Sequence, residues 1–334
     1  SMLQRPVAMA TKDIPNPNDI PLAIRGVAAQ KGPIIPRGWM RVAHWESEPS
    51  VLPSKQSGRL QLAEWITDAR HPLTARVMVN RIWYWMMGRG IVPSVDNFGN
   101  MGERPTHPEL LDYLATSFTN NGWSIKDLVR EIAVSRTYRL ATTTHATGLK
   151  QDSPNRYYWR RNRKRLRAED IRDAMLMVSG NLDKTLGGPG IKDGTKIEYG
   201  YSFSSNRRSV YLPVFRNALP EVFEVFDFAD PNIQRGARAN STVASQALWM
   251  MNHPFVIEQA RQAARRAQID GLSNSEQLAA DAYLQVLGRP PTMGELDIAR
   301  DLWMIGDRDA VENSERLGLL YQTLFQCIDF RYLD

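Results

Sequence analysis

The sequence predicts a mainly α-helical protein, with a helical-bundle core, an extended N-terminal arm and a small β-hairpin. Apolar residues recur at helical spacing through most of the chain, capping motifs precede several of these stretches, and only one short run is typical of a strand. With 334 residues and 43% hydrophobic content, the chain is long enough to bury one large core or two unequal ones.

Residues 1–58 are expected to form an extended arm that packs on the body. Segments such as DIPNPNDIPLAIRG and KGPIIPRGW are rich in Pro and Gly and hold no sustained period. No basic stretch followed by an apolar run occurs there, so no secretory signal is expected in this part. The leading Ser-Met is typical of the remnant of a cleaved tag.

A first helical bundle is expected over residues 59–140. One of its helices, LTARVMVNRIWYWMMGRG, is apolar almost all the way round yet contains Arg76, Asn80 and Arg81. A helix without a polar face lies inside a protein, and buried Arg and Asn side chains need hydrogen-bonding partners. We therefore predict a polar network that locks neighbouring segments of this bundle together.

Capping motifs mark the later helices of the bundle. Thr106 and Glu109 have the spacing of a capping box, and Ser124 with Asp127 indicates another N-terminal cap. Together with the segment RLQLAEWITDA and the buried helix, they give four helices joined by short connections. This pattern favours antiparallel packing.

Residues 141–240 are expected to connect the helical parts and to contain one helix and the hairpin. In the helix, which begins near Leu166, apolar residues face inward while Glu169, Arg172 and Asp173 share the outer side. These three side chains could serve acid/base chemistry or form an ordinary surface lattice of ion pairs, and the lattice is the favoured interpretation.

The expected hairpin uses the most strand-like run of the chain. This run is SVYLPVF, residues 209–215, and its partner would be the aromatic stretch at residues 199–203. The nearby LGGPGIKDG is read as a loop only, because it lacks the residues of a phosphate-binding loop.

Residues 241–334 are expected to be helical again and to form one continuous body with the first bundle. A helix opens on Pro254, capping boxes are expected at Ser273 with Glu276 and at Thr292 with Glu295, and a long helix closes the chain. The single cysteine, in that last helix, has no basic neighbour in sequence and is read as a small apolar residue.

The most basic stretch is NRYYWRRNRKRLR, residues 155–167, in which two Tyr and one Trp lie among the arginines. The net charge of +6 favours anionic partners. Guanidinium groups and ring faces can hold a sulfated or uronic sugar chain or a single-stranded nucleic acid. The alternative is a connector whose arginines pair with acids and whose rings pack into the core. The candidate ligand-binding residues are Tyr158, Trp159, Arg160, Arg163, Arg165, Arg167, Arg172, Arg207 and Arg208.

The candidates for acid/base catalysis are Glu169, Asp173, Asp227 and His107. For Asp227, capping of the backbone or pairing with upstream arginines is favoured over cation binding, and for His107 a hydrogen bond at a helix end is favoured. No Gly-x-Ser-x-Gly elbow, dinucleotide fingerprint or phosphate loop is present. The five histidines and the single cysteine are scattered, so neither a metal nor a cofactor is expected.

Several long motifs resemble the planctomycete-specific domain family. They are RLQLAEWITDARHPLTARVMVNRIWYWMMGRGIV, THPELLDYLATSF, WSIKDLVREIAVSRTYRL, RLRAEDIRDAML, RRSVYL, FDFADPN, STVASQALWMMN and LFQCIDFRYLD, and the resemblance covers nearly everything after about Leu22. It implies a C-terminal domain, with no assigned reaction, of large proteins exported to the periplasm or cell surface. Such proteins also carry cytochrome-c-like modules, but this sequence lacks the Cys-x-x-Cys-His haem attachment.

The leading functional hypothesis is a non-catalytic interaction or scaffold module that contacts an acidic polysaccharide or another module of the same precursor. The alternative is an enzyme acting on acidic or sulfated polysaccharide, which requires the candidate arginines and carboxylates to converge in one concave site. Nucleic-acid binding ranks third, because no known nucleic-acid module surrounds the basic stretch. No segment approaches the roughly 20 uncharged apolar residues of a membrane span.

Overall fold

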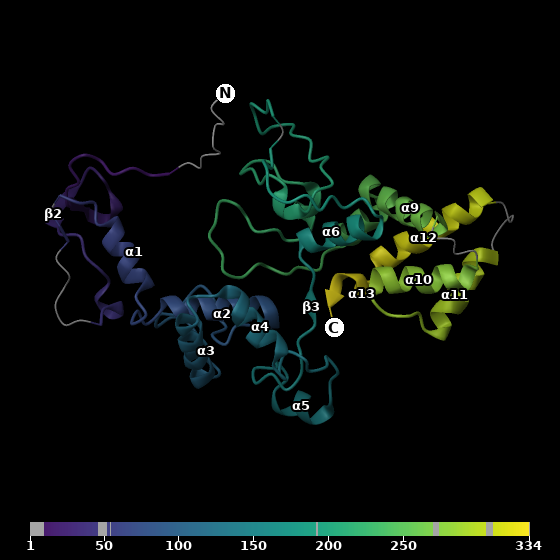
Figure 1. Ribbon diagram of the computed structural model, residues 1–334, viewed down its shortest axis with the longest axis horizontal. Helices are drawn as coiled ribbons and strands as arrows, with labels where there is room; N and C mark the ends of the chain where they lie inside the picture. Colours follow the sequence, from purple (N-terminus) through teal and green to yellow (C-terminus); the bar gives the residue numbers. More distant parts are fainter. Residues whose placement is uncertain are drawn as a thin grey trace. The chain divides into compact units, whose positions relative to one another are not determined.

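The computed structural model describes residues 10–45, 52–53, 55–191, 193–269, 274–304 and 310–333. The chain divides into two compact units, Ser1–Tyr138 and Arg139–Asp334. Within the described residues, thirteen α-helices are accompanied by only two antiparallel sheets of two strands each (Figure 1). The prediction of a mainly α-helical fold with a small hairpin is confirmed. Among the helices of these residues, none combines the length and the apolar character of a membrane span.

In its described residues, the first unit consists of a hairpin and four α-helices. Its elements are β1 (Ile20–Ala23), β2 (Lys31–Ile35), α1 (Arg59–Thr67), α2 (Thr74–Met87), α3 (Pro108–Asn120) and α4 (Ile125–Val134), with single 3-10 turns at Ile24–Gly26 and Arg41–Ala43. Helices α2, α3 and α4 pack on one another around buried apolar side chains such as Ile82, Leu114 and Phe118.

The hairpin lies in the N-terminal arm, so its predicted position at residues 209–215 is wrong. Ile20 of β1 pairs with Ile35 of β2. Residues Ser209–Tyr211 form a 3-10 turn instead of a strand. The backbone N–H of Ser209 donates to the carboxylate of Asp173 (2.8 Å), and Pro213 has no N–H to give to a neighbouring strand.

One predicted cap of the first unit is confirmed and one is wrong. Ser124 accepts a hydrogen bond from the backbone N–H of Asp127 (3.3 Å) at the start of α4. The capping residue of α3 is His107 rather than Thr106, because Pro108 occupies the first helical position. The hydroxyl of Thr106 donates instead to the carbonyl of Ile91 (3.2 Å).

The predicted polar lock exists at Asn80 of α2. This side chain is fully buried. Its Nδ2 donates to the carbonyl of Val92 (3.0 Å), and its Oδ1 accepts from the N–H of Val92 (2.8 Å). Gly90 lies against the same carbonyl group, because a Cβ at this position would come within 2.4 Å of the carbonyl oxygen of Val92. The amide thus fixes the segment after α2 to the helix.

The other two polar residues of α2 are not enclosed as predicted. The side chains of Arg76 and Arg81 are 38% and 42% exposed, and they pair with Asp112 (2.7 Å) and Asp96 (4.0 Å). Long arginine side chains can lay their apolar stems along a core while the charge stays in water. An apolar helix surface therefore does not by itself bury every guanidinium it carries.

The second unit is built from helices with one short strand pair. Its elements are α5 (Ala146–Gln151), β3 (Lys164–Arg165), α6 (Ala168–Val178), the 3-10 turn Ser209–Tyr211, α7 (Glu221–Val225), α8 (Ala244–Asn252), α9 (Pro254–Ile269), α10 (Ser275–Leu287), α11 (Met293–Met304), α12 (Ala310–Gln326), α13 (Ile328–Arg331) and β4 (Tyr332–Leu333). Helices α9 and α12 lie side by side, and α6, α8 and α10 pack around them (Figure 1). Buried side chains such as Met175, Phe223, Tyr321 and Phe325 form this core.

Local sequence motifs correctly predict several helix starts in the second unit. Helix α9 begins at Pro254 as predicted. Thr292 and Glu295 form a reciprocal capping box, with distances of 2.7 and 3.3 Å between each backbone N and the other residue's side-chain oxygen. Ser273 lies outside the described residues, and α10 is capped by Asn274. The predicted final helix breaks at Cys327, whose backbone is extended.

Candidate functional site

Two of the three aromatic residues of the basic stretch, Tyr158 and Trp159, pack into the second unit, whereas Tyr157 is exposed. Tyr158 is buried and adopts a left-handed backbone conformation (φ 53°). The indole N–H of Trp159 donates to the carbonyl of Asp152 (2.8 Å), and its ring packs edge-on against His145, with 4.6 Å between centroids. A Cβ at Gly148 would lie 2.7 Å from this indole. These two rings therefore take part in the packing of the unit.

Three of the candidate arginines are tethers that hold the protein's own backbone. Arg165 donates to the carbonyl of Ser241 and to the side chains of Gln246 (2.7 Å) and Asp227 (3.4 Å). Its side chain is only 7% exposed. A guanidinium suits this role because its five N–H donors can serve several acceptors at once.

Arg172 was predicted on the outer face of its helix, and this prediction is wrong because the side chain is buried. It donates to the carbonyl oxygens of Ser205 and Arg207 (3.0 Å to the latter) and to the hydroxyl of Ser209 (3.2 Å). Burial lowers the pKa of the guanidinium, and adjacent Asp173 opposes that shift. The charge is retained, since arginine is not deprotonated in proteins.

Arg207 binds backbone carbonyls in the same way, in this case those of the loop at residues 185–189. It donates to the carbonyl oxygens of Thr185 (3.1 Å), Gly187 and Pro189 (3.2 Å), and its guanidinium lies 4.1 Å from the ring centroid of Tyr211. Arg172 holds the segment that contains Arg207, and Arg207 holds residues 185–189. The loops after α6 are therefore tied to the helix by successive arginines.

The remaining candidate arginines do not converge. Arg160 lies over the ring of Trp159, at 5.2 Å, and Arg163 pairs with Asp329 at 3.6 Å. Arg167 is the capping residue of α6, where its backbone N–H donates to a carboxylate. Arg208 is exposed. The predicted ligand-binding set is thus spread over the unit.

Each candidate catalytic carboxylate of the second unit has an internal partner. Glu169 pairs with Arg238 at 2.7 Å. Asp173 accepts from the hydroxyl of Ser209 at 2.6 Å, and also from its backbone N–H. Asp227 accepts from the N–H and the hydroxyl of Ser241, both at 2.8 Å.

His107 lies in the first unit at the start of α3, where its Nδ1 is 2.9 Å from the hydroxyl of Thr106. No metal-binding group of three or more His, Cys, Asp or Glu side chains is found in the described part of the chain. Within the described part of the second unit, Glu169, Asp173 and Asp227 are each paired with an arginine or a serine rather than with one another.

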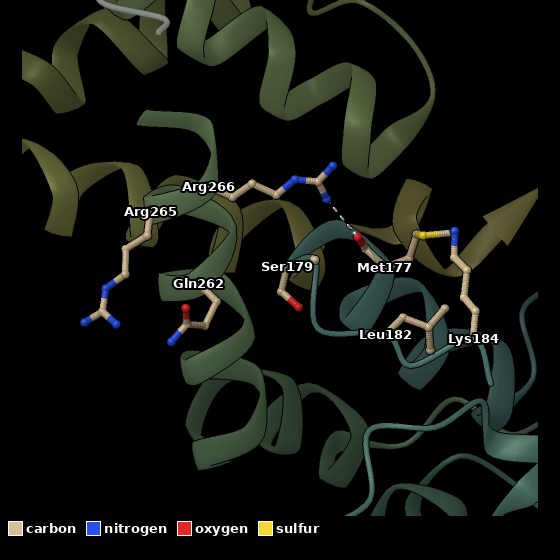
Figure 2. A pocket seen from close by; sticks show the side chains of 8 residues that line it. Met177, Ser179, Leu182, Lys184, Gln262, Arg265 and Arg266 are labelled. Carbon is tan, nitrogen blue, oxygen red and sulfur yellow. Dashed lines mark hydrogen bonds between the residues drawn. The ribbon is translucent and has the colours of Figure 1, made fainter. Parts of the chain in front are cut away.

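A cavity of about 470 Å³ lies where α6 ends beside α9 (Figure 2). Its lining includes Lys184, Arg265 and Arg266 and no carboxylate. Helix α9 supplies Gln262 and both arginines, and the segment from Met177 to Lys184 supplies the rest. Three positive charges without an acid make this cavity suited to anionic groups.

The end of α6 fixes the shape of this cavity. Gly180 has a left-handed backbone (φ 81°) and terminates the helix. Arg266 donates to the carbonyl of Met177 (3.3 Å), so it stabilises the negative end of the helix dipole. Behind it, the hydroxyl of Ser179 donates to the buried side chain of Gln259 (2.7 Å).

Two cations of this cavity are available to a ligand. Lys184 and Arg265 are exposed, and within the described residues neither side chain forms a hydrogen bond or an ion pair. Sequence reasoning missed both, because they lie about 80 positions apart and only the packing of α6 on α9 makes them line one cavity, from opposite sides in Figure 2. The one local signal is the run RQAARRAQ, which places several cations on a single helix.

Residues 58–303 match the model of a protein family described as PSD1, protein of unknown function (DUF1553). No curated protein matches the chain. No solved structure matches it either.

Proposed function

The chain belongs to the PSD1 family of proteins of unknown function, and from that premise we propose that it is a non-catalytic module that binds an acidic polysaccharide. The observation that carries this proposal is the cavity beside the end of α6, with three cations and no carboxylate. Sulfate or uronate groups would meet Lys184 and Arg265 there. Guanidinium groups bind such oxyanions through paired N–H donors.

The state of the carboxylates favours binding over catalysis. An acid/base pair needs one carboxyl group free to take up a proton at the substrate. Glu169, Asp173 and Asp227 are each held by an arginine or a serine of the same unit. A polymer bound at the cationic cavity would find none of these three side chains in the lining.

The setting of the module is part of the proposal. Export to the periplasm or cell surface would bring the domain to such polysaccharides, and cytochrome-c-like modules of the same precursor would be its neighbours along the chain. The resemblance of the sequence motifs to planctomycete-specific domains supports this setting.

Binding to a panel of sulfated and uronic polysaccharides tests the proposal. For the two available cations, the relation established for DNA gives a roughly 12-fold loss of affinity between about 50 and about 200 mM salt. A less densely charged polysaccharide should show a smaller loss. Neutral dextran should not bind. Absence of salt-sensitive binding to every acidic polymer would refute the proposal.

Matched variants locate the site. Lys184→Gln and Arg265→Gln should each weaken binding several-fold, because each removes one of three charges in the cavity. Arg156→Gln removes an exposed charge from the basic stretch outside the cavity and should leave the affinity unchanged. If Arg156→Gln weakens binding while the cavity variants do not, the polymer is held by the basic stretch and our assignment is wrong.

A further inference from the structure

A second cavity, of about 330 Å³, lies in the first unit between α2, α3 and the segment that joins them. Five apolar side chains line it, among them Phe98, Pro105 and Pro108. Its charged side chains are Arg76, Glu103 and Asp112. Small-molecule sites have this composition of mostly apolar walls with a few polar groups, and their volumes run from roughly 300 to 1,000 Å³.

Hydrogen bonds hold the side chains of Arg76 and Asp112 in a defined geometry and leave some of their donors and acceptors unused. The Nε of Arg76 donates to Oδ1 of Asp112 (2.7 Å), and its Nη1 donates to the carbonyl of Pro72 (2.7 Å). These two bonds orient the guanidinium. Within the described residues they leave Nη2 of Arg76 and Oδ2 of Asp112 without a hydrogen bond.

Glu103 adds a further acceptor to this cavity. Its backbone N–H donates to the hydroxyl of Ser94 (2.8 Å), which fixes the residue at the rim. Its side-chain carboxylate forms no hydrogen bond or ion pair in the described part of the chain. The lining therefore offers an aromatic ring, one group of N–H donors and two carboxylates at the edge of an apolar pocket.

The charges of the lining select among ligands. One cation and two carboxylates give this cavity a net charge of −1, so an anion is repelled here. Apolar walls favour a ligand with a C–H surface. Adjacent donors and acceptors suit hydroxyl groups, each of which both donates and accepts a hydrogen bond.

We propose that this cavity binds one uncharged pyranose ring of a neutral saccharide. The C–H face of the sugar lies against the ring of Phe98. Its hydroxyls donate to Asp112 and Glu103 and accept from Nη2 of Arg76. This site is distinct from the cationic cavity of the second unit and takes a ligand of different charge, so either assignment can fail without the other.

The test uses the whole chain and a panel of methyl glycosides of neutral hexoses, pentoses and N-acetylhexosamines. Saturation-transfer NMR should detect weak binding of at least one glycoside. The affinity should not change with added salt, because the ligand carries no charge. Phe98→Ala and Asp112→Asn should each lower the affinity by roughly three- to tenfold, the effect of losing one aromatic contact or one hydrogen bond.

Controls separate this site from unspecific effects. Asp127→Asn changes a carboxylate of the same unit whose exposure matches that of Asp112 (56% against 57%) and which also faces an arginine; it should leave binding intact. Glu103→Gln alters only an exposed rim side chain, so it serves as the reporter if Phe98→Ala does not fold. The proposal would be overturned if no glycoside showed saturation transfer, or if Glu103→Gln and Asp112→Asn bound the glycoside as tightly as the wild type. It would also be overturned if the cavity bound the cation butylammonium and none of the sugars.

Discussion

Replacing Asn80 by Ala gives the sharpest test of how the first unit is held together. The side chain is the hydrogen-bonding partner of both backbone groups of Val92, and this contact is buried. A buried polar group that loses its partner costs about 1–3 kcal/mol, so two such groups cost roughly 2–6 kcal/mol. We expect Asn80→Ala to lower the free energy of unfolding of the first unit by about 4 kcal/mol.

Urea denaturation measures this loss, and hydrogen exchange of the Val92 amide locates it. The amide should exchange much faster in the variant, because its acceptor Oδ1 is gone. Asn121→Ala is the matched control: its amide donates at the surface to Ser117 (3.3 Å), and its loss should change stability by less than about 0.5 kcal/mol. A loss below about 1 kcal/mol for Asn80→Ala, with unchanged exchange at Val92, would refute the reasoning.

Two further outcomes follow from the arginine contacts of the second unit. Arg172→Met should destabilise that unit by about 2–4 kcal/mol and speed tryptic cleavage after Arg207, because two backbone carbonyls and a hydroxyl lose their donor; unchanged cleavage would contradict this. The hydrogen bond from Arg289 lowers the pKa of Glu295 from 4.5 to about 2. Because the pKa of Glu295 is lower in the folded state than in the unfolded state, the ionised carboxylate stabilises the fold at pH values above the unfolded pKa. At about pH 6 the wild type should therefore be more stable than Glu295→Gln. It should lose that advantage as the pH falls from about 4.5 towards 2. Urea denaturation from about pH 6 to about pH 3 measures the difference in free energy of unfolding between the two proteins. If that difference does not depend on pH, the ion pair is not its source.

The helices could be predicted from the sequence because their signals are local. The hydroxyl of Ser124 reaches an N–H three residues away, and Thr292 and Glu295 bond each other within one turn. The failure at Thr106 has a non-local cause, since its hydroxyl serves Ile91 across the loop. The misplaced hairpin has the same kind of cause, because Asp173 takes the N–H that a strand at Ser209 would need.

The candidate sites depended on tertiary structure even more. Composition indicated excess positive charge but not which cations remain available. Arg165 and Arg172 look as available in the sequence as Arg265, yet the first two are enclosed by the carbonyls they bind. Lys184 becomes part of a site only because α6 ends against α9.

The arginine tethers of the second unit also determine how mutagenesis of this protein must be interpreted. A scan that neutralises basic residues one at a time would find strong losses of stability and binding at Arg165, Arg172 and Arg207, since each side chain donates to several acceptors of the chain itself, backbone carbonyls among them. Such losses would report unfolding of loops rather than contact with a polyanion. Even a lysine at these positions would not keep the loops in place, because a single ammonium group cannot reach the same set of acceptors as a planar guanidinium.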